Sequence, residues 1–232
     1  MAYSMNRSSS GQYLTNAVSH LDRKTAILLT AERLFAERGY HAVSLRTIAS
    51  EAGVPLALVG YYFGAKHELF HAIFLHWQPS IEQRLAQLDI VLNAFDPSAL
   101  RCLIQAFVKP MLTLRASPAG EYHALLLARE LANSATPEAN QVLADMFDPI
   151  AHMFIDKLHA LRSNWPRARA AWAYQFAMGA LVHHVVDRRV QRLSRGQNAP
   201  HDAAAEPLLI DFITAGIDAV LPAAFTPSTQ ET

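Results

Sequence analysis

The sequence of 232 residues contains a single cysteine, Cys102. One thiol excludes an internal disulfide and a cysteine-based metal cluster, and such low usage is typical of a protein in a reducing compartment. No apolar run is long enough to span a membrane, and the N-terminus lacks the apolar core of a signal peptide. We therefore expect a cytoplasmic protein without a membrane partner.

An excess of charge is also missing, because 20 basic and 20 acidic side chains give a formal net charge of zero. A domain that binds nucleic acid is usually basic, so this total counts mildly against DNA binding. The charge is unevenly distributed, however. Residues 1–67 hold four acids against a larger basic set, namely Arg7, Arg23, Lys24, Arg33, Arg38, Arg46 and Lys66.

Strand-like alternation of apolar and polar residues is absent as well, whereas apolar residues recur at helical spacing along most of the chain. With 51% hydrophobic and 17% charged residues, the chain has the composition of a folded globular protein. We predict an all-α fold with a bend near Gln78, where Pro79 interrupts a helix. The predicted helices cover 22–38, 45–52, 56–62, 66–93, 97–114, 121–133, 137–161, 166–193 and 203–221.

The most informative stretch runs from residue 44 to residue 69 and reads SLRTIASEAGVPLALVGYYFGAKHEL. Ser44 is suited to cap a short amphipathic helix, Gly53 to end it, and Pro55 to begin a second helix. Two short helices joined by a turn that contains glycine form a helix-turn-helix, whose second helix can lie in the major groove of DNA.

These residues carry a family resemblance over about 24–75. The pattern resembles the N-terminal domain of the TetR family of bacterial repressors. The segment GYYFGAKHEL is similar to the motif NYHFGSKEGL, which is common in one branch of that family. The pattern comprises Gly39-Tyr40, Ser44-Leu45, Ile48-Ala49, Ala52-Gly53-Val54, Tyr62-Phe63 and Lys66. The resemblance implies a repressor that binds a palindromic double-stranded DNA operator as a homodimer and is released by a small, mostly apolar effector.

The resemblance also implies a division of the chain. Residues 22–70 would form the helix-turn-helix DNA-binding domain and residues 71–225 a helical bundle for effector binding and dimerisation. The segments 1–21 and 226–232 are expected to be a flexible N-terminal extension and a flexible tail. The helices over 166–193 and 203–221 resemble the pair that forms the dimer interface in the family.

The DNA contacts that the resemblance implies come from ten positions: Ser44, Arg46, Thr47, Pro55, Leu56, Ala57, Gly60, Tyr61, Tyr62 and Lys66. Arg46 could instead be a solvated surface side chain, and Tyr62 could be a half-buried core aromatic. Pro55 and Gly60 depart from the family pattern and remove polar contacts. We therefore expect modest affinity for each half-site, and a helical adaptor that no longer binds DNA is an alternative.

Candidate effector residues are large apolar side chains of the C-terminal helices with one arginine: Phe107, Met111, Tyr122, Leu126, Arg129, Phe147 and Phe176. Plain core packing is the alternative for each apolar residue, and an ion pair with Glu130 is the alternative for Arg129. The basic segment 157–195 could meet an anionic effector or could be a solvated face.

A metal site and an enzyme are the remaining alternatives. Four residues of metal-binding types lie near one face of a helix, namely Asp148, His152, Asp156 and His159. With eleven histidines such spacings arise by chance, so we predict neither a metal nor a cofactor. No nucleophile, base and acid group together as catalysis requires. Within the same family, an activator or a regulator without a ligand remains open.

Overall fold

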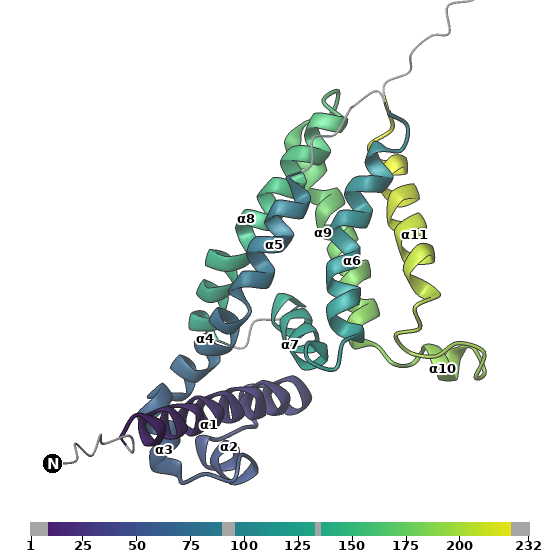
Figure 1. The fold of residues 1–232 in the computed structure, drawn as a ribbon. Helices are drawn as coiled ribbons and strands as arrows, with labels where there is room; N and C mark the ends of the chain where they lie inside the picture. The colour runs from purple at the N-terminus through teal and green to yellow at the C-terminus, as the bar shows by residue number, and fades with distance from the viewer. Residues whose placement is uncertain (1–8, 90–95, 133–135, 224–232) are drawn as a thin grey trace, which may run out of the picture. The chain divides into compact units, whose positions relative to one another are not determined.

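The structure is a computed structural model that describes residues 9–89, 96–132 and 136–223 (Figure 1). Every described element is a helix, so the all-α prediction is confirmed. The chain divides into two compact units between His76 and Trp77. None of the described helices combines the length and apolar character that crossing a bilayer requires.

The described part of the first unit contains four helices around an aromatic core. They are α1 (Ser9–Arg38), α2 (Leu45–Glu51), α3 (Leu56–Phe63) and α4 (Lys66–His76). The rings of Phe35, Tyr40 and Phe70 lie 5.1–5.6 Å apart between centroids, and Phe74 packs on Phe70. Such tilted and edge-to-face pairs stabilise a small domain beyond the area they bury. This core joins α1 to α4 and holds the helices between them.

Helix α1 begins at Ser9, so the expected start at Asp22 is wrong. No proline separates these two positions and Gly11 is the only glycine between them, so nothing in the local sequence ends the helix towards its N-terminus. Residues 9–21 of the predicted extension are therefore helical. Residues 1–8 and the predicted tail 226–232 lie outside the described residues.

The turn between α2 and α3 follows the local signals in the sequence. The backbone N–H of Thr47 donates to the Ser44 hydroxyl oxygen at 3.0 Å and caps α2. After α2, Gly53 adopts a φ of +65°, which favours glycine. The N–H of Val54 donates to the carbonyl of Ala49 at 3.0 Å and closes the turn. These contacts fix the direction in which α3 leaves α2.

Ion pairs also attach α2 to α1. The Glu51 carboxylate accepts hydrogen bonds from Arg33 at 2.9 Å and from Arg38 at 3.4 Å. The hydrogen bond from Arg33 lowers the pKa of Glu51, assisted by the charges of both arginines. Because these side chains are exposed, the pairs orient α2 more than they stabilise it.

Within the described residues, the second unit is a bundle of seven helices. They are α5 (Gln78–Leu88), α6 (Ala99–Ala116), α7 (Glu121–Ala132), α8 (Pro137–Leu161), α9 (Arg167–Val186), α10 (Val190–Leu193) and α11 (Ala205–Val220). Helix α5 runs beside α8, and α6 runs beside α11, as Figure 1 shows. Helix α9 packs against α7, α8 and α11. Leu103, Phe107, Leu126, Phe154 and Leu181 are among the buried residues of this core.

The helix predicted over 166–193 ends at Val186, so its expected length is wrong. The carboxylate of Asp187 accepts a hydrogen bond from the backbone N–H of Arg189 at 2.8 Å and another from its guanidinium at 2.7 Å. These bonds hold the pKa of Asp187 well below its usual range. Aspartate that bonds the backbone two residues on favours a turn over a continuing helix. The chain therefore turns here before α10.

The helix predicted from residue 66 onwards is interrupted near Gln78, as expected. Helix α4 ends at His76, and α5 begins at Gln78 with Pro79 in its first turn. Proline is tolerated in a first turn because the missing N–H would have no partner within the helix. Helix α5 ends at Leu88, and residues 90–95 lie outside the described part of the chain.

Candidate functional site

Helix α3 has one buried face and one exposed face. Val59 and Phe63 point into the core of the first unit. Leu56 and Gly60 lie on the exposed face, together with Tyr61, whose side chain is 78% exposed. A helix that is anchored on one side and projects apolar and aromatic side chains on the other is suited to dock against another surface.

A shallow depression of about 510 Å³ lies where the start of α2 meets α3. It is lined by Ser44, Leu45, Arg46, Leu56 and Gly60. The structure thus brings four of the ten predicted DNA-contact positions to one place. A Cβ added at Gly60 would meet nothing within 4 Å, so the α3 backbone is open to close approach there.

The other predicted DNA-contact positions lie close in sequence to the residues that line this depression. Pro55 and Ala57 are exposed at the start of α3. Thr47 is half-buried, and its hydroxyl lies 2.8 Å from the Ser44 hydroxyl within the cap of α2. Tyr62 is half-buried, with its ring centroid 5.3 Å from that of Tyr61. The two tyrosines therefore have different environments although they are neighbours.

Lys66, at the start of α4, has a packing contact that sequence reasoning missed. Its ammonium lies 4.1 Å from the ring centroid of Tyr40 and 5.9 Å from that of Phe35. The side chain is half-buried, and this burial lowers the pKa of Lys66. An ammonium over an aromatic face is attracted by the ring quadrupole. Lys66 therefore supports the core of the first unit as well as offering a charge.

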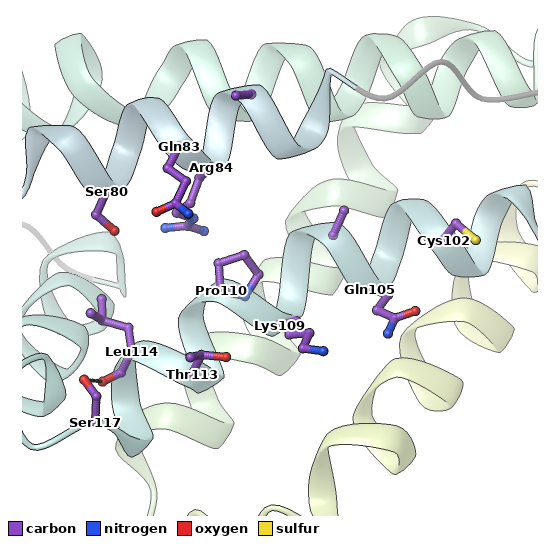
Figure 2. A pocket seen from close by; sticks show the side chains of 12 residues that line it. Ser80, Gln83, Arg84, Cys102, Gln105, Lys109, Pro110, Thr113, Leu114 and Ser117 are labelled. Carbon is purple, nitrogen blue, oxygen red and sulfur yellow. Dashed lines mark hydrogen bonds between the residues drawn. The ribbon is translucent and has the colours of Figure 1, made fainter.

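The second unit contains a groove of about 850 Å³ between α5 and α6 (Figure 2). It is lined by Ser80, Gln83, Arg84, Ala86, Cys102, Gln105, Ala106, Lys109, Pro110, Thr113, Leu114 and Ser117. Figure 2 shows the side chains of Gln83 and Arg84 reaching from α5 towards Pro110 on α6. This volume is in the range of small-molecule sites.

The seven predicted effector residues are not among the described residues that line this groove. Phe107, Met111, Leu126 and Phe147 are buried, and the Phe107 ring packs on Phe154 at 4.5 Å between centroids. Tyr122 is half-buried, whereas Arg129 and Phe176 are exposed.

The residues that line this groove are mostly polar or small, so a search for large apolar side chains does not identify it. Arg84 sits three residues after Ile81 and four before Leu88, both of which are buried. An arginine on the apolar stripe of a helix is unusual, because long charged side chains are rarely placed there without a partner. This spacing was the available signal in the sequence.

The four metal-type residues of α8 do not form a metal site. The guanidinium of Arg167 donates to the Asp156 carboxylate at 2.6 Å. In the described part of the chain, no group of three or more His, Cys, Asp or Glu side chains is arranged to hold a metal ion.

Two family models match the chain. Residues 27–73 match the model for bacterial regulatory proteins of the tetR family, and residues 105–216 match a tetracyclin repressor-like C-terminal domain. Together the two matches cover about two thirds of the sequence.

Two curated relatives resemble part of the chain. The HTH-type transcriptional activator FasR of Mycolicibacterium smegmatis is 33% identical over 101 residues, which is 44% of this chain and 46% of that protein. A HTH-type transcriptional repressor of Mycobacterium tuberculosis is 40% identical over 74 residues, which is 31% of this chain and 39% of that protein. The chain therefore spans less than half the length of either relative.

The fold also resembles that of a solved structure, the ketosteroid transcriptional regulator KstR2 of Mycobacterium tuberculosis. The TM-score is 0.59 at 20% identity, and the similarity covers 84% of this chain and 94% of that chain. At this identity the likeness concerns the fold alone. With the helix-turn-helix geometry of α2 and α3 and both family models in agreement, the chain belongs to the TetR family of bacterial regulatory proteins.

Proposed function

We propose that the chain is a cytoplasmic transcriptional regulator that binds a palindromic operator as a homodimer and releases it when a small molecule binds. The exposed face of α3 beside Arg46 carries this proposal. Val59 and Phe63 anchor α3, so Leu56, Gly60 and Tyr61 are left outside the core. A helix held in this way can enter the major groove of DNA without unfolding anything else.

Each side chain on this surface has a distinct contact to offer. The Arg46 guanidinium is suited to bidentate hydrogen bonds with guanine, and Leu56 to apolar contact with a thymine methyl group. The Tyr61 hydroxyl can donate to a phosphate oxygen. Because Gly60 has no side chain, the backbone of α3 can lie close to the groove edge.

The proposed dimer uses the exposed faces of α9 and α11. Trp172 and Phe176 lie one helical turn apart on α9 and are stacked, with ring centroids 5.9 Å apart. Leu208 and Phe212 lie one turn apart on α11, and all four side chains are at least 60% exposed. Large contiguous apolar surfaces typically mark an interface between proteins.

A groove between the same two helices supports this assignment. It has a volume of about 220 Å³ and is lined by Ala173, Phe176, Ala177, Ala180, Phe212, Ile213, Gly216, Ile217 and Val220. Added Cβ atoms at Gly179 and Gly216 would meet nothing within 4 Å, so the chain's own packing does not require these glycines. A mid-helix glycine costs about 0.5–1 kcal/mol relative to alanine. Close approach of a partner helix would explain both.

We propose repression as the effect on transcription. An effector that favours one spacing of the two helix-turn-helix units shifts the dimer away from the operator, and by linkage the operator weakens effector binding equally. The relatives include one named an activator and one named a repressor. A footprint that overlaps the promoter would indicate repression, and one upstream of it would indicate activation.

Selection of genomic fragments tests the function. The full chain is mixed with sheared DNA of the source genome, and bound fragments are sequenced. We expect enrichment of a palindromic site with half-sites about one or two helical turns apart. The selection is run at about 50–100 mM salt, because binding to DNA weakens steeply at higher salt. Failure to enrich any shared sequence under these conditions would overturn the proposal.

The Arg46→Ala variant makes the selection sharper. If Arg46 reads a base, the variant loses about 1–3 kcal/mol of discrimination at one position in each half-site, and that position becomes relaxed in the enriched set. Arg192→Gln, at an exposed position on α10, removes one charge from the second unit and serves as control. An unaltered pattern with Arg46→Ala would contradict the base contact.

A second measurement concerns the proposed phosphate contact of Lys66. We expect Lys66→Gln to weaken binding to all sequences and to flatten the salt slope by about one for each half-site, because one fewer counterion is released. Binding is measured as a function of salt concentration. Since Lys66 also packs on Tyr40, thermal unfolding of the variant is recorded in parallel. A lowered Tm with an unchanged slope would mean that Lys66 only supports the core.

A further inference from the structure

The groove between α5 and α6 carries positive charge without compensating acid. Two of its described lining residues, Arg84 and Lys109, are cationic, and none of those described is acidic. Several more have neutral polar side chains, such as Gln83 and Gln105. Within the groove, therefore, both cations are available to a negatively charged ligand.

Arg84 is the more telling of the two cations. Among the residues that the structure describes, no hydrogen bond or ion pair holds its guanidinium. The side chain is half-buried, and this burial lowers the pKa of Arg84 to about 10, so the group stays protonated at neutral pH. A desolvated charge without a partner destabilises a fold. Its presence is explained if a ligand supplies the missing negative charge.

A second donor lies near Arg84. Tyr174 on α9 and Arg84 influence each other's pKa. Burial and, to a smaller extent, the carboxylate of Asp148 on α8 raise the pKa of Tyr174 to about 12, so its hydroxyl keeps its proton and can donate a hydrogen bond. No acceptor for this hydroxyl is found within the described residues. Tyr174 packs behind the groove rather than lining it, so Arg84 is the lining residue that is suited to pair with one carboxylate.

Helix α6 indicates the shape of the rest of the ligand. Ala106, Pro110 and Leu114 recur every four residues and form an apolar stripe along the groove, with Cys102 one turn before them. From Cys102 to Ser117 the lining spans about 22 Å at 1.5 Å per residue. An elongated apolar body can lie along this stripe while its charged end reaches α5.

We propose that this groove is the effector site of the regulator proposed above, and that its effector is an organic carboxylate with an elongated apolar body whose carboxylate pairs with Arg84. That the bound molecule acts as an effector rests on the proposed function, whereas the binding of a carboxylate in the groove does not. Lys109, exposed on the α6 side, adds long-range attraction for the anion.

Calorimetric titration of the full chain tests the site without DNA. The probes are decanoate, tetradecanoate and, as the uncharged match, decanamide. We expect at least one of the two carboxylates to bind with a Kd below about 1 mM, which is a typical order of magnitude for an unoptimised ligand. Decanamide should bind at least about 10-fold more weakly, because it lacks the charge that pairs with Arg84. Arg84→Gln should weaken carboxylate binding by about 10- to 100-fold, whereas Arg192→Gln should not. Absence of binding by both carboxylates, or equal binding to Arg84→Gln, would overturn the inference.

Two further readouts separate a binding role from a structural one. Because Arg84 is unpaired, Arg84→Met should raise the Tm of the free protein, and a lowered Tm would mean that Arg84 supports the fold instead. Cys102, the single cysteine of the chain, is exposed in the groove. Bound carboxylate should slow its modification by N-ethylmaleimide, and an unchanged rate would place the ligand elsewhere.

The titrations test the groove and the selection of genomic fragments tests the regulator, so a negative result in one does not imply a negative result in the other. Enriched DNA without carboxylate binding would overturn the groove assignment and leave the regulator. Carboxylate binding through Arg84 without enriched DNA would overturn the regulator and leave the groove as a carboxylate site. When both succeed, the same carboxylate should release the enriched fragment from the wild-type chain but not from Arg84→Gln.

Discussion

Phe212→Asp is expected to convert the proposed homodimer into monomers and to weaken operator binding by more than about 100-fold. A charge placed in the apolar centre of an interface is left unpaired and desolvated, which costs several kcal/mol, and every 1.4 kcal/mol is a factor of ten. A monomer would contact one half-site, and we expect few polar contacts there because Pro55 and Gly60 depart from the family pattern. Light scattering after gel filtration gives the mass, and fluorescence anisotropy gives the DNA affinity.

The protomer itself should tolerate this substitution. Phe212 is 70% exposed on α11, so its removal takes little from the core. Leu193→Asp on α10 is the matched control, because Leu193 is 68% exposed and lies outside the α9 and α11 faces. The control should remain dimeric and bind DNA as the wild type does. A dimeric Phe212→Asp with full affinity would show that the two-fold interface lies elsewhere.

Phe107→Ala is expected to lower the free energy of unfolding of the second unit by about 3–5 kcal/mol, through lost burial and the cavity left behind. The Phe107 ring is 1% exposed and packs between Phe154 and Tyr174, with centroids 4.5 and 5.8 Å away. Since domains are stable by only about 5–15 kcal/mol, this change is a large fraction of the total. Urea unfolding followed by circular dichroism measures it.

Two further substitutions serve as controls for Phe107→Ala. Leu193→Ala, at an exposed position, should change the free energy of unfolding by less than about 0.5 kcal/mol. Phe107→Leu keeps most of the buried volume and should cost less than the alanine variant. A cost below about 1 kcal/mol for Phe107→Ala would mean that the ring faces an open cavity, as the sequence-based effector assignment requires.

The helix-turn-helix could be predicted from the sequence because its geometry depends on local chemistry. Ser44 caps α2 through its own hydroxyl, Gly53 takes the positive φ that follows the end of α2, and Pro55 precedes the first residue of α3. Each of these preferences acts over three or four residues and needs no distant partner.

The boundaries that were predicted wrongly depend on weaker local signals. Helix α1 extends to Ser9 because no residue there ends it, although Asp22 has the chemistry of a cap. Helix α9 stops at Val186 because Asp187 bonds to Arg189, a contact that the helical spacing of the apolar residues does not reveal. Propensity is a weak prior at helix ends, and a single side-chain contact can outweigh it.

From residue order alone, the all-α class, the helix-turn-helix and the family resemblance could be established, since these follow from periodicity, caps and turn residues. Which apolar side chains are buried could not. Helix α9 has apolar residues on two faces, yet Ala173 and Ala177 are buried whereas Trp172 and Phe176 are exposed. Spacing identifies a face as apolar, but the packing of distant helices determines what covers it. For the same reason the groove beside Arg84 emerged only when α5 and α6, separated in sequence, were brought together in space.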